Sequence, residues 1–218
     1  MDRIDKKDKL IEKLKSLNIP FVFNSQKYEI KNLKYIIVGD NPGKKECNEK
    51  KYFIGPSGQI LRNHFKKFHI VTDFDNECIV FNKTFIYTEK TKELKNIDKE
   101  ILNETQDYCA TEISKLSNEK QIPILIFGKS NICKGELFEK FWTRLFKEVI
   151  DKKNILVFSH PSYGNFSKEW KKIDKEGITF QNDNEKLIKI GVRNLTTIIK
   201  DPRCAKFVTL TIKKIDCK

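Results

Sequence analysis

Four short apolar runs along the chain predict the strands of a buried sheet. They cover residues 35–39, 78–82, 122–128 and 154–159. None of the runs alternates between apolar and polar residues, and each is long enough for one strand. Continuous apolar strands are typical of sheets that are covered on both faces. The pattern therefore favours a parallel sheet in an α/β protein.

Segments with helical spacing of apolar residues separate these runs. They are 5–17, 57–68, 98–120 and 135–151. Strands that alternate with helices in this way are typical of βαβ units. Beyond them we expect a helix around 183–200 that Gly191 interrupts, and then a β-prone segment over 207–215. No repeat, low-complexity stretch or linker divides the chain, so we expect a single domain over 1–218.

A polar cluster follows each predicted strand. The clusters are Gly39-Asp40-Asn41-Pro42-Gly43, Asn82-Lys83-Thr84, Gly128-Lys129-Ser130 and His160-Pro161-Ser162. The carboxyl ends of parallel strands lie along one edge of a sheet, where α/β proteins bind ligands. We therefore expect polar side chains from all four clusters to converge on one cleft. They are Asp40, Asn41, Asn82, Ser130 and His160. Gly-Lys-Ser does not complete a phosphate-binding P-loop, because Pro123 stands where that motif requires glycine.

The net charge of the chain indicates which class of partner it binds. Among 218 residues, 43 Lys and Arg face 30 Asp and Glu, which gives a formal net charge of +13. An excess of this size favours a polyanionic partner, first a nucleic acid and second a membrane surface. A generally lysine-rich composition is the alternative explanation.

The cysteines indicate no metal site. They stand at positions 47, 78, 109, 133, 204 and 217, and no two are spaced as Cys-x-x-Cys. This spacing signals neither a zinc ribbon nor an iron–sulfur site. The N-terminal residues have no apolar core typical of a signal peptide, and no apolar run is long enough to span a membrane. We expect reduced thiols in an intracellular protein, cytoplasmic or, in a eukaryote, nuclear, without a membrane partner.

Taken in order, the motifs resemble those of the uracil-DNA glycosylase superfamily. They are the cluster 39–43, the segment 52–61 (YFIGPSGQIL), Asn82, the cluster 128–130 and the segment 160–163 (HPSY). FIGPSGQIL is the most specific part, and it is similar to the thermophile-type iron–sulfur branch. The resemblance covers about residues 33–166, between an N-terminal helix with its connection (1–32) and a C-terminal extension (167–218). It implies a three-layer α/β/α sandwich around a central four-stranded parallel sheet.

The chain departs from each branch of that superfamily. The iron–sulfur branch holds its cluster with four cysteines, whereas in this chain only Cys109 stands at a matching position. We therefore expect no cluster, no metal and no other cofactor. The Gly-x-Asn-Pro-Gly form of 39–43 resembles the single-strand-selective and mismatch-specific branches. His-Pro-Ser at 160–162 is unlike the mismatch-specific branch, so the branch stays open.

The resemblance implies an enzyme that extrudes a uracil nucleotide from DNA and hydrolyses its N-glycosidic bond. The residues assigned to the uracil base are Phe53, which would stack on it, Asn82, which would hydrogen-bond its edge, and Gly39. His160 would donate to uracil O2 as negative charge develops there. Asn41 is the favoured residue for placing the attacking water. Asp40 is the alternative, as a general base or by stabilising the sugar cation.

The remaining motif residues are assigned to the DNA backbone. Gly43, Ser57, Lys129, Ser130 and Ser162 would bind phosphates. Tyr163 or Phe166 would wedge into the gap left by the extruded base. We expect a monomer that acts on uracil-containing DNA. Two alternatives stay open: a weakly active or inactive uracil- or DNA-binding protein of the same fold, and an unrelated nucleotide- or phosphate-binding α/β protein.

Overall fold

Four parallel strands form the centre of the protein in the computed structural model, which describes residues 3–205. The strands are β1 (Tyr35–Gly39), β2 (Cys78–Asn82), β3 (Ile124–Phe127) and β4 (Ile155–Phe158). Their order across the sheet is β2-β1-β3-β4. In the register of the sheet, Gly39 lies beside Asn82 and Phe127 beside Phe158. The four apolar runs are therefore confirmed as strands, with β3 and β4 slightly shorter than predicted.

Helices connect the strands, as the spacing of apolar residues predicts. They are α1 (Arg3–Ser16), α2 (Lys44–Glu49), α3 (Pro56–Lys67), α4 (Phe74–Glu77), α5 (Lys99–Lys120), α6 (Glu139–Glu148), α7 (Asn165–Asp174), α8 (Asp183–Lys200) and α9 (Pro202–Ala205). Short 3₁₀ segments cover Ile30–Asn32, Thr91–Asn96, Lys152–Asn154 and Ser162–Gly164. The predicted helix over 135–151 begins only at Glu139. Gly135 takes a left-handed φ of 80° in the turns that precede α6.

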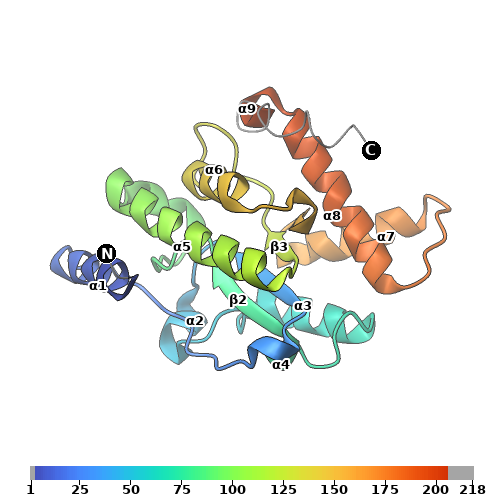
Figure 1. The fold of residues 1–218 in the computed structure, drawn as a ribbon, viewed down its shortest axis with the longest axis horizontal. Coiled ribbons are helices and arrows are strands. Elements are labelled where there is room, and N and C mark those ends of the chain that lie inside the picture. Colours follow the sequence, from blue (N-terminus) through green and yellow to red (C-terminus); the bar gives the residue numbers. More distant parts are fainter. Residues whose placement is uncertain (1–2, 206–218) are drawn as a thin grey trace.

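Successive strand residues point to opposite faces of the sheet and form two cores. On one face, Ile36, Val38 and Ile126 pack against apolar side chains of α1, α5 and α6. On the other face, Ile37 and Leu125 pack with side chains of α3, α4 and α7. Both faces of the sheet are thus covered by helices (Figure 1), and the three-layer α/β/α sandwich is confirmed.

Helix α8 runs unbroken and packs on β4, which corrects the predicted interruption at Gly191. A Cβ atom at Gly191 would lie 2.7 Å from Leu156 Cβ and 2.9 Å from Phe158 Cζ. The glycine therefore allows a close approach between helix and strand. Residues 183–200, predicted to belong to an extension, complete the sandwich. The β-prone segment 207–215 lies outside the described residues.

No helix described between residues 3 and 205 combines the length and the apolar character that a membrane crossing requires.

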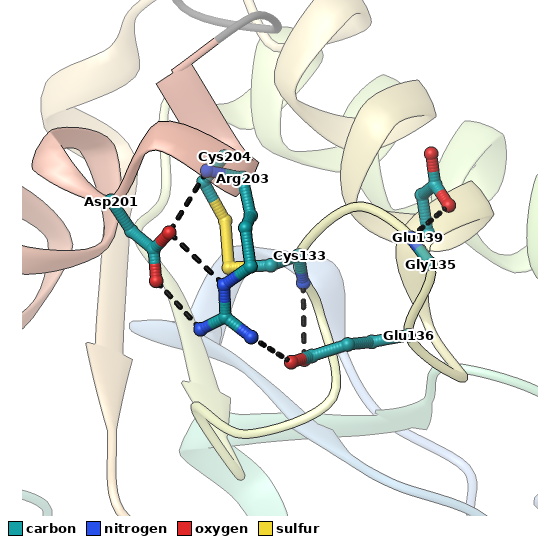
Figure 2. Close-up of a disulfide and its surroundings, with 7 residues drawn as sticks. All are labelled: Cys133, Gly135, Glu136, Glu139, Asp201, Arg203 and Cys204. Carbon is teal, nitrogen blue, oxygen red and sulfur yellow. Dashed lines mark hydrogen bonds and ion pairs between the residues drawn. A yellow bond between two sulfur atoms is a disulfide. The ribbon is translucent and has the colours of Figure 1, made fainter.

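Cys133 and Cys204 form a disulfide, which corrects the expectation that the cysteines are all reduced thiols. The bond joins the loop after β3 to α9, with a Cα–Cα distance of 4.9 Å (Figure 2). Arg203 reinforces the same junction, because its guanidinium contacts Asp201 at 2.7 Å and Glu136 at 2.9 Å. Cys47, Cys78 and Cys109 are free. The intracellular location, which the reduced thiols had suggested, stays a prediction.

Reduction of this disulfide is expected to lower the free energy of unfolding by about 2–4 kcal/mol. The bond joins residues separated by 71 positions, so it restricts a long loop of the unfolded chain. Urea unfolding with and without dithiothreitol measures the effect. The double variant Cys133→Ser/Cys204→Ser should show no response to the reductant. Equal midpoints for the wild-type protein in both conditions would contradict the pairing.

A buried histidine is expected to make the free energy of unfolding depend on pH. His64 of α3 is 7% exposed and lies among three aromatic rings. The rings are Phe68, Phe166 and Trp170. Burial, together with the charges of Lys186 and Lys67, lowers the pKa of His64 from 6.5 to about 4. Nε2 of His64 has no hydrogen-bond partner among the described residues.

The His64→Leu variant is expected to be less sensitive to acid than the wild type. Between pH 6.5 and 4 the unfolded chain binds a proton at His64 and the folded chain does not, so acid favours unfolding. The wild type should therefore lose up to about 3 kcal/mol relative to the variant over this window. Urea unfolding of both proteins at several pH values gives the difference. If the free energies of unfolding of the two proteins change equally with pH, then His64 does not titrate in this way.

Candidate active site

A cleft of about 640 Å³ opens at the carboxyl edge of the sheet. The chain passes from β1 to β2 on one side of β1 and then crosses to β3 on the other side, and α/β folds bind ligands at such a switch point. Seven of the predicted site residues line this cleft. They are Asp40, Asn41, Gly43, Phe53, Ser57, Asn82 and His160. Clusters from β1, β2 and β4 therefore meet as predicted, whereas Ser130 after β3 is exposed outside the lining.

Two glycines allow the Phe53 ring to reach the base of the cleft. Phe53 is 4% exposed and adopts a left-handed φ of 55°. A Cβ atom at Gly39 would lie 2.4 Å from Phe53 Cε2 and 2.5 Å from Asn82 Oδ1. A Cβ atom at Gly58 would lie 1.8 Å from the carbonyl oxygen of Phe53. A larger residue at Gly39 would displace the Phe53 ring, and one at Gly58 would displace the Phe53 backbone.

Glu46, which the sequence motifs do not include, ties the first motif to the Phe53 segment. Its carboxylate accepts hydrogen bonds from the backbone N–H of Phe53 and, at 2.8 Å, from that of Gly43. Burial raises the pKa of Glu46 above its usual value, and these backbone hydrogen bonds offset part of that rise. Because the N–H of Gly43 already donates a hydrogen bond to Glu46, Gly43 is not free to bind phosphate through that group. The spacing Gly-x-x-Glu at the start of α2 is typical of a helix cap and could have revealed Glu46.

Asn82 lines the cleft and has an unpaired amide nitrogen. The residue is 3% exposed, and Nδ2 has no hydrogen-bond partner among the described residues. Buried amide groups are nearly always hydrogen-bonded, because leaving one unpaired costs free energy. A ligand with an acceptor at this position would satisfy Asn82.

His160 is held with one ring nitrogen occupied. The backbone N–H of Ser162 donates to His160 Nδ1 at 3.2 Å, and Ser162 Oγ lies 2.9 Å from the same atom. Burial lowers the pKa of His160, the charge of Asp40 raises it, and the charge of Lys83 lowers it. In a neutral ring whose Nδ1 accepts a hydrogen bond, the proton is on Nε2. His160 thus carries a neutral N–H donor.

The two candidates for placing water have different surroundings. Asp40 pairs through Oδ1 with the ammonium of Lys83, another residue that the sequence did not single out. The amide of Asn41 is held by the loop after β2. Nδ2 of Asn41 donates to Thr88 Oγ1 at 3.0 Å, and Thr91 Oγ1 donates to Asn41 Oδ1 at 2.8 Å. Asn41 therefore joins two loops, and Asp40 joins two strand ends.

The remaining predicted phosphate ligands lie apart from the cleft lining. Lys129 forms an ion pair with Glu169 at 2.6 Å, so its charge is already matched. Ser162 contacts His160, and Ser130 stays exposed. The lining itself holds Lys44 and Lys45 against three carboxylates, Asp40, Glu46 and Glu89. The net positive charge of the chain is therefore not concentrated among the residues that line the cleft.

The two predicted wedge residues have opposite environments. Tyr163 is 90% exposed and adopts a left-handed φ of 55°, which is a strained conformation for a tyrosine. Phe166 is fully buried and packs against Phe127 and Phe158 at ring-centroid distances of 5.2 and 5.5 Å. Phe166 is thus a core residue, which corrects its assignment as a wedge.

Within residues 3–205, no three His, Cys, Asp or Glu side chains are grouped so that they could hold a metal ion. Cys109, the one residue matching an iron–sulfur ligand, is a buried free thiol. Burial raises the pKa of that thiol well above its usual range, which disfavours the thiolate that a metal would need.

Comparison with known proteins identifies the family. The sequence model of the uracil DNA glycosylase superfamily matches residues 26–183, a longer stretch than the motifs alone suggested. No curated protein matches the sequence. The match spans more than half of the chain and includes every residue of the cleft lining. The chain therefore belongs to the uracil DNA glycosylase superfamily, which assigns it in general terms to the DNA glycosylases of DNA repair.

Proposed function

We propose that this protein removes uracil from DNA by hydrolysing the N-glycosidic bond. The observation that carries the proposal is the meeting of three groups in one cleft: the Phe53 ring, the unpaired Asn82 amide and the His160 ring. An aromatic face, an amide and a donor N–H match the face and the edge of a pyrimidine. Family membership supports a glycosylase acting on DNA.

Recognition of the base follows from these groups. The target nucleotide is extruded from the stack, so that the uracil lies on the Phe53 ring. Asn82 Nδ2 donates to uracil O4, and its Oδ1 accepts from N3–H. Thymine differs from uracil by a methyl group at C5. Cytosine, in contrast, has a hydrogen-bond donor where uracil has the acceptor O4. The amide therefore favours uracil over cytosine.

The chemistry is a hydrolysis in which the bond to the base breaks first. As the C1′–N1 bond breaks, its electron pair stays on uracil N1 and negative charge spreads to O2. His160 donates Nε2–H to O2 and stabilises that charge. The sugar cation takes up the oxygen of a water molecule at C1′. Asp40 orients this water and takes its proton, in preference to Asn41, because the Asn41 amide is already bound to Thr88 and Thr91.

The exposed Tyr163 ring fills the space that the extruded base leaves in the duplex. Ser57 and Lys44, at the rim of the cleft, contact the phosphates beside it. The protein acts as a monomer, since one chain carries every group that the reaction needs.

Alkali-induced strand cleavage of a uracil-containing oligonucleotide tests the proposal. Single-stranded and double-stranded substrates are compared with matched oligonucleotides that carry thymine at the same position. We expect cleavage of the uracil strand alone, because only loss of the base makes it sensitive to alkali. Tight binding of the uracil substrate without cleavage would instead favour a binding protein of the same fold.

A further inference from the structure

Lys83 is a fully buried lysine directly behind the active-site cleft. Its side chain has an exposed fraction of 0%. Burial of an ammonium group is costly unless the charge is paired and hydrogen-bonded. Lysine at the end of a strand is usually solvated, so this placement requires an explanation from the partners of Lys83.

Those partners come from the ends of two neighbouring strands. The ammonium binds Asp40 Oδ1 after β1 and donates to the carbonyl oxygen of Gly128, after β3, at 2.8 Å. It also lies 4.9 Å from the centroid of the Phe138 ring, within the range of a cation–π contact. All of these contacts hold the charge in one position.

The backbone after β3 is shaped around this ion pair. Gly128 adopts a φ of +102°, a conformation that disfavours other residues. A Cβ atom there would lie 2.5 Å from Asp40 Oδ1 and 3.1 Å from Lys83 Nζ. A glycine at this position therefore leaves room for both charged groups at the switch point of the sheet.

The pairing occupies only one of the two oxygens of Asp40. Oδ1 is turned toward Lys83 and Gly128, and no hydrogen bond to Oδ2 is found within residues 3–205. Asp40 nevertheless lines the cleft, with a side-chain exposure of 17%. Oδ2 is thus the oxygen available to a molecule in the cleft.

We propose that Lys83 is the positioning residue of the active site: it binds one oxygen of Asp40 so that the other oxygen holds the water that attacks C1′. This inference rests on the proposed uracil excision and deepens it. Lys83 does not touch the substrate, and it acts through Asp40 alone. The proposal also gives a reason for the burial of a lysine at the end of a strand.

The neighbouring histidine supports this arrangement. The charges that act on the pKa of His160 are Asp40 after β1 and Lys83 after β2, and they act in opposite directions. Removing the Lys83 charge leaves Asp40 unopposed, so the pKa of His160 should rise. The pH dependence of excision therefore reports on the charges of Asp40 and Lys83 beside His160.

The Lys83→Met variant tests the proposal in single-turnover excision of a uracil-containing oligonucleotide. We expect the rate at saturating protein to fall by roughly 10²-fold, the usual contribution of a positioned acid or base. DNA affinity should change by less than about threefold, because Lys83 lies behind the cleft lining. Lys186→Met is the matched control. Lys186 is also buried, at 5% exposure, and pairs with Asp174 away from the cleft, so its loss should leave the rate unchanged.

A double-mutant cycle with Asp40→Asn separates positioning from stability. If Lys83 acts only through Asp40, then Asp40→Asn and Asp40→Asn/Lys83→Met should excise uracil equally slowly. The double variant carries no buried carboxylate without its cation, so this comparison holds even if Lys83→Met alone fails to fold.

Three results would overturn the inference. The first is a wild-type rate for a folded Lys83→Met, and the second is a further loss of more than about threefold in the double variant relative to Asp40→Asn. The third is an inactive wild-type protein, which would remove the proposed function as well. The first two results arise with an active wild type, and they leave uracil excision intact.

Discussion

Replacement of Asp40 by asparagine is expected to slow uracil excision by roughly 10²- to 10⁴-fold, the range typical of a lost general base. Asparagine keeps the size of the side chain but cannot take a proton from water. Asp40 lines the cleft and is held by Lys83, so its second oxygen has a fixed direction. Single-turnover excision at saturating protein measures the chemical step without product release.

Asn41→Ala is the variant to compare with Asp40→Asn. Asn41 binds Thr88 and Thr91, so its loss should loosen the loop after β2 and reduce the rate by a smaller factor. The sequence motif had favoured Asn41 for placing the water. A larger loss with Asn41→Ala than with Asp40→Asn would restore that assignment and exclude Asp40 as the group that places the water.

Replacement of His160 by alanine is expected to slow excision by roughly 10²- to 10³-fold, as for the loss of one donor to a developing anion. Because Ser162 donates to Nδ1, the proton of the neutral ring is on Nε2. Burial lowers the pKa of His160, so the neutral donor is present from below pH 6.5 upward. The rate should therefore not fall between pH 6.5 and 8 through titration of this residue.

Ser162→Ala provides the matched control for His160→Ala. It removes the hydroxyl but keeps the backbone N–H that fixes the ring. Excision should stay within about threefold of the wild type, because the orientation of His160 is preserved. A loss as large as that of His160→Ala would show that the hydroxyl, and not the backbone, controls the ring.

The sheet was predictable because its strands are buried on both faces. Side chains such as Ile36 and Ile37 point to opposite cores, so the strand reads as an uninterrupted apolar run. Gly191 was misread as a break in its helix. This glycine is required because α8 packs closely against Leu156 and Phe158 of β4, and that contact exists only in the folded structure. The Cys133–Cys204 pair was invisible for the same reason, since its partners lie 71 positions apart.

The strand ends predicted the location of the candidate site, but not the partners of its residues. Asp40, Asn82 and His160 meet in the cleft because parallel strands end at one edge. Lys129 looked like a phosphate ligand, and in the structure Glu169 of α7 already pairs with it. Lys83, which the sequence did not single out, is buried and pairs with Asp40. Pairings of this kind join distant segments, so local patterns do not report them.

The most direct test of uracil excision is the release of the free base. A uracil-containing oligonucleotide is incubated with an excess of the wild-type protein, and free uracil is quantified by mass spectrometry. We predict one uracil released per substrate molecule, with no base released from the matched thymine and cytosine oligonucleotides. The absence of free uracil from a folded protein that binds the uracil substrate would contradict the proposed activity.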